Sequence, residues 1–255
     1  PYVLERLRLA AIRSGGLEAL AAPLERALIN QPGAAGLLHL LAETWMRLGD
    51  DGRALELYRR IMVLDPRDTQ AAAAAGELAL RGGDYPAAEA ALRRALGLEP
   101  KNPDLLYRLA RTVLEQGDRA QAEGLLRKSI TADPSRPLPV LALAVLYRNS
   151  GRTDRAQALY AAFLADHQDN GSVRRERAEL NSALGRWADS ERDYRVLAGN
   201  GQARPADFDR LGTACLKDER PAEALEAYDR GLALDPDSPV LGFHRVQALA
   251  ASGDV

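Results

Sequence analysis

Apolar residues recur along the chain at helical spacing, in pairs of stripes separated by short polar breaks. In the stretch 103–136 the first stripe consists of Leu106, Leu109, Ala110, Val113 and Leu114. The second stripe consists of Ala122, Leu125, Leu126 and Ile130. Residues spaced in this way lie on one face of a helix. The pattern therefore predicts two amphipathic helices in this stretch.

The breaks carry signals that stop and start helices. Between the two stripes, Gly117 suits a helix C-terminus and Asp118 suits the N-cap of the next helix. Before the pair, Asn102 is a capping residue and Pro103 suits the first helical turn. After the pair, Pro134 ends the second helix, because proline disfavours helical backbone at the preceding residue. The stretch is therefore a helix–turn–helix unit with defined ends.

This unit returns every 34 residues along the chain. With Ala35 as place 1, place 15 reads Gly15, Gly49, Gly83, Gly117, Gly151, Gly185, Glu219 and Gly253. Place 20 reads Leu20, Ala54, Ala88, Ala122, Ala156, Ser190 and Ala224. The predicted units are 1–34, 35–68, 69–102, 103–136, 137–170, 171–204, 205–238 and the partial unit 239–255. Small residues at places 8 and 20 would let the two helices of a unit approach closely.

The unit 35–68 resembles the tetratricopeptide repeat (TPR), a helix–turn–helix motif of this length. The residues that carry the resemblance are Leu38, Leu41, Ala42, Trp45, Gly49, Ala54, Tyr58, Ile61 and Pro66. The resemblance implies an all-α fold, a right-handed superhelical TPR solenoid of antiparallel helix pairs. One unit has too small a core to stand alone, so neighbouring units must stack. We expect a single TPR solenoid over residues 1–255.

Charge and hydropathy exclude some partners. The formal net charge is −2, with 34 basic and 36 acidic residues of mixed sign. A nucleic-acid surface needs a basic stripe, so we expect no nucleic-acid partner. The longest apolar run, 139–147, is too short to cross a bilayer, so we expect no membrane span in this segment. The Ala- and Arg-rich usage suggests a bacterial protein, with cytoplasm or periplasm as the compartment left open; the oligomeric state is open too.

Motifs of catalysis and metal binding are missing from the sequence. His39, His167 and His244 lie in different units, and neither an HExxH nor a CxxC motif occurs. We therefore expect no catalytic residues, no cofactor, no metal and no enzymatic activity. The single cysteine, Cys215, stands at a core-facing place and is expected to be a buried apolar residue.

In TPR-like solenoids the first helices of successive units line a concave groove that binds partner peptides, and the resemblance implies such a groove here. The predicted groove residues are Tyr107, Arg111, Leu114, Leu138, Leu141, Val145 and Arg148. An exposed apolar patch rimmed by arginine suits a peptide; the other interpretation is that these side chains pack adjacent helices. Where TPR proteins that grip acidic chaperone tails carry Lys and Asn, Glu43 and Glu77 would repel a carboxylate.

We therefore expect a non-catalytic scaffold that binds a partner peptide or protein in the concave groove. Two alternatives remain open. The chain could be the recognition arm of a larger bacterial enzyme, similar to TPR-bearing glycosyltransferases, or an envelope scaffold for exopolysaccharide export, similar to the TPR regions of such secretion systems. The chain begins without Met and ends after one helix of a pair, so we expect a segment of a longer protein.

The unit 171–204 departs most from the pattern. Its core-facing places 4, 7 and 11 hold Arg174, Arg177 and Asn181, and its place 20 holds Ser190. Less apolar area would be buried here, and solenoid stability is a sum over units and interfaces. We expect this unit to be the least stable interior one and to let the two halves flex; the other interpretation is a degenerate but rigid repeat.

Overall fold

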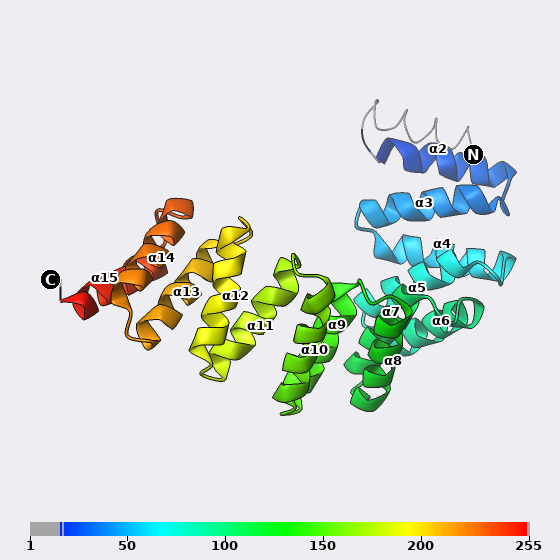
Figure 1. The fold of residues 1–255 in the computed structure, drawn as a ribbon. Helices are drawn as coiled ribbons and strands as arrows, with labels where there is room; N and C mark the ends of the chain where they lie inside the picture. Colours follow the sequence, from blue (N-terminus) through cyan, green and yellow to red (C-terminus); the bar gives the residue numbers. More distant parts are fainter. Residues whose placement is uncertain (1–15, 17, 254–255) are drawn as a thin grey trace. The chain divides into compact units, whose positions relative to one another are not determined.

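The computed structural model describes residue 16 and residues 18–253, and every regular element among them is an α-helix (Figure 1). The first helix expected for the unit 1–34, together with Gly15, lies outside the described residues. The chain contacts group into two compact units, Pro1–Asp133 and Pro134–Val255, which are described separately below. The all-α repeat fold expected from the sequence is confirmed.

The Pro1–Asp133 unit contains helices that alternate between the first and second members of each repeat. The first helices are α3 (Ala35–Arg47), α5 (Thr69–Arg81) and α7 (Pro103–Glu115). The second helices are α2 (Glu18–Asn30), α4 (Asp51–Leu64), α6 (Tyr85–Leu98) and α8 (Arg119–Ala132). Each first helix packs against the second helix that follows it, and α5 also contacts α7. First helices of neighbouring repeats therefore lie on the same side of this unit.

The Pro134–Val255 unit repeats this arrangement. Its first helices are α9 (Pro137–Asn149), α11 (Gly171–Ala183), α13 (Pro205–Lys217) and α15 (Pro239–Ser252). Its second helices are α10 (Thr153–Asp166), α12 (Trp187–Gly199) and α14 (Pro221–Leu234). First helices again touch first helices, α9 with α11 and α13 with α15. We call the exposed side of the first helices, within either unit, the first-helix face.

The turn inside each repeat depends on one backbone conformation. Gly117 has φ of 88°, in the left-handed region that glycine enters at little cost. The chain then reverses into α8, where the Asp118 carboxylate accepts a hydrogen bond from the backbone N–H of Gln121 at 2.9 Å. In the second unit Glu219 adopts the same left-handed conformation with φ of 58°. The repeat thus keeps its turn geometry even where the glycine is replaced.

The small residues at places 8 and 20 lie where the two helices of a repeat pack directly against each other. Ala122 of α8 is fully buried. At place 8, a Cβ added to Gly76 would lie 2.6 Å from Cγ of Leu92, and one added to Gly212 would lie 2.5 Å from the ring of Tyr228. Distances this short leave no room for a larger side chain. The close approach expected from the small residues is confirmed.

Larger side chains fill the remaining space of each repeat. The tyrosines at place 24 are among the largest fully buried side chains, and they are Tyr58, Tyr160, Tyr194 and Tyr228. They reach from the second helices toward the first helices, where Tyr228 approaches the hydroxyl of Thr213. Cys215 is also fully buried, as the sequence predicted. The core of each unit therefore lies between its first and second helices.

A larger side chain at place 20 should destabilise the packing between the two helices of a repeat. We expect Ala122→Phe to lower the free energy of unfolding by about 1–3 kcal/mol, because the added ring must displace the neighbouring first helix. Arg119→Ala, three residues earlier on the exposed side of the same helix, should change little. Urea melts followed by circular dichroism measure both changes, and equal small effects would contradict the packing described here.

Candidate functional site

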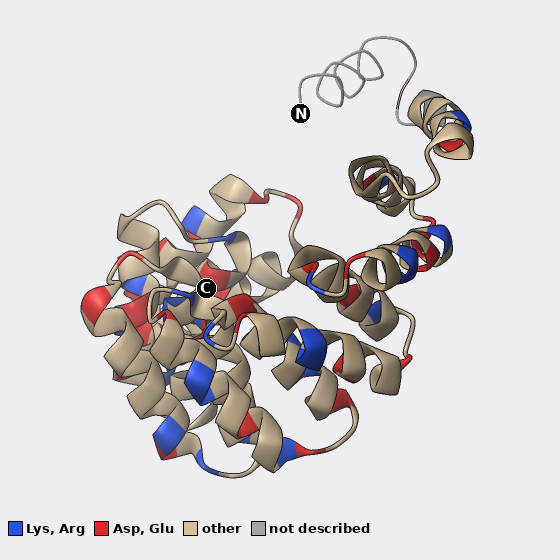
Figure 2. Cartoon of the chain, turned by 90° about the vertical axis from the view of Figure 1, so that its right-hand side faces the viewer, with Lys and Arg blue, Asp and Glu red and all other residues tan. Residues whose placement is uncertain are grey.

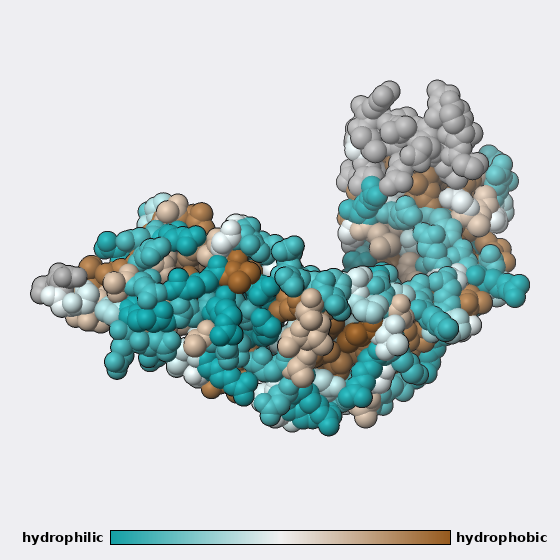
Figure 3. Space-filling view, viewed as in Figure 1, coloured by the Kyte–Doolittle hydropathy of each residue, from teal (hydrophilic) through white to brown (hydrophobic). Residues whose placement is uncertain are grey.

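Apolar side chains are exposed on the first-helix face of α9. Leu138 and Val145 are 52% and 42% exposed, and Leu141, between them, is half-buried. The opposite side of the same helix carries the buried residues Val140, Leu143, Ala144 and Tyr147. Figure 3 shows apolar atoms as separate patches within a largely hydrophilic surface. Leu138, Leu141 and Val145 thus leave an apolar patch at the surface of the second unit.

The arginine predicted beside this patch is already paired. Nη1 of Arg148 lies 3.3 Å from Oε2 of Glu176, which comes from the next first helix, α11. Both side chains are partly exposed, so the pair contributes little to stability. Its main effect is to neutralise the guanidinium on the first-helix face.

The remaining predicted groove residues lie in the first unit, on α7. Tyr107, Arg111 and Leu114 are each half-buried. The Arg111 guanidinium lies 6.0 Å from the centre of the Tyr107 ring and 3.6 Å from Oε1 of Glu77 on α5. Each unit therefore presents apolar or aromatic groups next to an arginine that a neighbouring glutamate neutralises.

Ion pairs between first helices extend along each unit. Glu77 also pairs with Arg108 at 3.5 Å, and Glu179 pairs with Arg210 at 4.0 Å. Nδ1 of His244 lies 2.6 Å from the carboxylate of Asp209. Basic and acidic residues are accordingly interspersed along the helices (Figure 2). The sequence analysis missed these pairs, although Glu77–Arg108 and Glu179–Arg210 share a spacing of 31 residues that could have shown them.

The tyrosines beneath this face are neutral at physiological pH. Burial, with a smaller contribution from Glu43, raises the pKa of Tyr58 to about 12. Burial also raises the pKa of Tyr160 to about 12, with Glu176 contributing in the same direction. A phenol with so high a pKa does not act as a base near neutral pH. These side chains therefore support the first-helix face as packing groups.

The unit 171–204 carries a polar core in which the unusual residues have partners. Asp193, whose side chain is 2% exposed, accepts hydrogen bonds from Arg174 at 3.0 Å and from Arg177 at 2.6 and 2.8 Å. The hydrogen bonds between Arg177 and Asp193 raise the pKa of Arg177, and they outweigh the opposite effect of burial. Asn181 accepts a hydrogen bond from Gln157 at 2.6 Å. The sequence analysis identified the two arginines and the asparagine but not Asp193, the acid that holds the arginines at core places.

One group of residues has the composition of a metal site but already holds other partners. Ligand atoms of Glu191, Cys215 and Glu223 lie within 4.8 Å of one another. Arg220 donates hydrogen bonds to both carboxylates, and Arg195 also bonds to both. Burial raises the pKa of the Cys215 thiol to about 11. The cluster is therefore internally neutralised, and the thiol is protonated near neutral pH.

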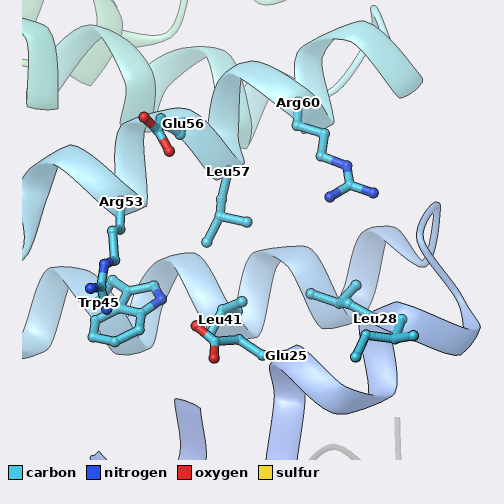
Figure 4. Close-up of a pocket in the computed structure, with 9 residues that line it drawn as sticks. Glu25, Leu28, Leu41, Trp45, Arg53, Glu56, Leu57 and Arg60 are labelled. Atoms are coloured by element: carbon cyan, nitrogen blue, oxygen red, sulfur yellow. The ribbon is translucent and has the colours of Figure 1, made fainter. Parts of the chain in front are cut away.

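Pockets lie on the other side of each unit, between consecutive second helices. The pocket between α2 and α4 has a volume of about 510 Å³ (Figure 4). Leu57 points from α4 toward Leu41 of α3, and the Arg53 guanidinium stacks 4.3 Å from the centre of the Trp45 ring. Similar pockets lie between α4 and α6, between α10 and α12, and between α12 and α14. The sequence analysis did not predict these pockets.

No helix in the described part of the chain has the length and apolarity that a bilayer span requires.

Comparisons with known proteins agree with this geometry. A family model described as the cilia and flagella-associated protein 70 middle TPR-like domain matches residues 37–166. A second model, described as a tetratricopeptide repeat, matches residues 141–207. No protein of curated function matches the sequence significantly.

Solved structures resemble the chain at low sequence identity. A tetratricopeptide repeat protein from Parabacteroides merdae is 16% identical, with a TM-score of 0.65 over 98% of this chain and 100% of that one. PilF of Pseudomonas aeruginosa is 18% identical, with a TM-score of 0.63 over 86% of this chain and 99% of its own. MamA of Desulfovibrio magneticus is 15% identical, with a TM-score of 0.60 over 66% and 96%. Likeness at these identities concerns the fold.

The polar core of the unit 171–204 leads to a stability prediction. Asp193→Asn removes the charge that two arginines share, and we expect the free energy of unfolding to fall by about 3 kcal/mol. Asp189→Asn is the matched control on the same helix, since its ion pair with Arg192 is exposed and should matter little. Chemical denaturation measures both values. Equal effects of the two substitutions would contradict a structural role for the Asp193 cluster.

Proposed function

Because the chain belongs to the tetratricopeptide repeat family, we propose that it is a non-catalytic scaffold that binds a peptide or protein partner on its first-helix face. The observation that supports this most is the exposed apolar patch of Leu138, Leu141 and Val145 on α9. An apolar patch within a polar surface is typical of a site that binds a partner. On the first unit, Tyr107 and Leu114 are the proposed counterparts.

The charges of this face favour a particular kind of partner. Arg111 and Arg148 are each neutralised by a glutamate of a neighbouring helix. These pairs reduce the attraction of the two guanidiniums for a strongly acidic peptide. We therefore propose a partner segment that offers apolar side chains to the patch and polar groups to its edge.

The two alternative contexts use the same surface. A recognition arm of a larger glycosyltransferase and an exopolysaccharide-export scaffold would both bind their partners through first helices. The proposal about the surface therefore holds in either context, and it is tested on the chain itself.

The test uses a peptide selected on the chain from a random library displayed on phage. We expect Leu138→Asp combined with Val145→Asp to weaken binding of that peptide by about tenfold or more, because a charge would be buried against apolar groups. Tyr107→Ala tests the α7 part of the surface in the same way. Fluorescence anisotropy measures affinity, and circular dichroism checks that helicity is retained.

The matched control places the same charge on second helices. Ile29→Asp combined with Val63→Asp changes side chains that are 78% and 80% exposed. This variant should bind the peptide with unchanged affinity. Weakening by the control variant but not by the α9 variant would move the binding surface to the second helices and contradict the proposal.

A further inference from the structure

The pocket between α10 and α12 differs from the α2–α4 pocket in the residues of its floor. The α2–α4 pocket has Leu41 and Trp45 at its floor, with Glu25, Arg53, Glu56 and Arg60 on the second helices around it. The α4–α6 pocket is lined largely by alanines, together with Arg59 and Arg94. The α10–α12 pocket has a volume of about 300 Å³, and its polar lining residues are Gln157, Arg177, Asn181, Arg186, Asp189, Arg192 and Asp193. A pocket of this size accommodates a small molecule.

The difference arises from two places of the repeat. At places 7 and 11 the α2–α4 pocket has Leu41 and Trp45. The α10–α12 pocket has Arg177 and Asn181 at the same places. Both polar side chains rise from α11, which forms the floor between the two second helices. The change from apolar to polar therefore occurs at equivalent positions of the same architecture.

Two arginines of α11 share one carboxylate at the floor of the pocket, which Arg177 and Asp193 line. Arg174 and Arg177 share the single carboxylate of Asp193, which is almost fully buried. Arg177 uses Nε and one N–H of Nη2 for this carboxylate. Its remaining N–H groups form no other hydrogen bond within residues 18–253. A guanidinium held rigidly in this way is preorganised for a second anion.

Two further arginines stand at the rim. Arg186 pairs with Asp154 at 3.6 Å, and this aspartate is 91% exposed. Arg192 pairs with Asp189 at 3.0 Å, with both side chains more than half exposed. Exposed pairs of this kind are worth about 0–1 kcal/mol, so an incoming anion can replace them. Arg186 is also the N-cap residue of α12 and makes no side-chain cap hydrogen bond.

We propose that the α10–α12 pocket binds a small organic anion through a carboxylate or phosphate group. Arg177 on the floor and Arg186 at the rim bind the anionic oxygens, and Arg192 closes the site from α12. The amides of Asn181 and Gln157 supply neutral polar contacts for the rest of the molecule. This site is separate from the first-helix face, since its walls are second helices.

The test uses the fluorescence of Trp187, which directly follows Arg186 in the sequence. The chain has two tryptophans, so Trp45→Phe leaves Trp187 as the only indole. In this background we expect a saturable fluorescence change on titration with succinate or inorganic phosphate, beyond that caused by sodium chloride at matched ionic strength. Saturation by one anion and not by the other identifies the group that the pocket accepts and supports the proposal.

Variants locate the site. Arg186→Gln combined with Arg192→Gln should weaken the affinity for the anion at least tenfold. The midpoint of thermal unfolding checks that this variant is folded. Arg59→Gln combined with Arg93→Gln removes two arginines of similar exposure from second helices of the first unit. This control should leave the affinity for the anion unchanged. A response equal to that of sodium chloride, or an equal loss in both double variants, would overturn the proposal.

Discussion

The close contact between the two helices of a repeat is the constraint on which the rest of the structure depends. In the repeats from 35–68 to 205–238, places 8 and 20 hold only alanine, serine or glycine, and Gly76 and Gly212 leave no room for a larger side chain. This contact fixes which side of each helix is buried. The opposite side of the first helix then remains for the surface. Within each unit, first helices touch one another, whereas pockets open between consecutive second helices. Two kinds of surface therefore result from one packing contact.

Charge gives each surface a separate character. On the first-helix face, arginines are neutralised across the gap between repeats, as in Arg148–Glu176. Exposed pairs add little stability, but they lower the attraction of this face for strongly charged ligands. In the unit 171–204 the charges are instead inside, where Asp193 holds two arginines. A buried carboxylate in such a place permits arginine at positions that are apolar in other repeats.

The period of the sequence was sufficient to predict the helices, because each repeat carries its own stop and cap. Gly117 and Asp118 adopt the conformations that these residue types favour. Contacts between repeats were harder to predict. Arg174 and Arg177 at core places required an acid, but Asp193 lies on the next helix, and only the packed structure shows that it reaches both. The second-helix pockets also had no signal in the sequence, because they depend on the spacing between consecutive second helices.

The exposure of Leu138 and Val145 could not be derived from periodicity either. Apolar residues on a first helix can pack against the neighbouring repeat or remain at the surface, and the pattern is the same in both cases. In the structure Val140 and Leu143 are buried, whereas Leu138 and Val145 remain exposed. We propose that the face that they form binds a partner. The amide hydrogen exchange of the chain with and without a bound peptide tests it most directly. We expect the backbone amides of first helices such as α9 and α11 to exchange more slowly when the peptide is bound. Protection confined to second helices such as α10 and α12 would contradict it.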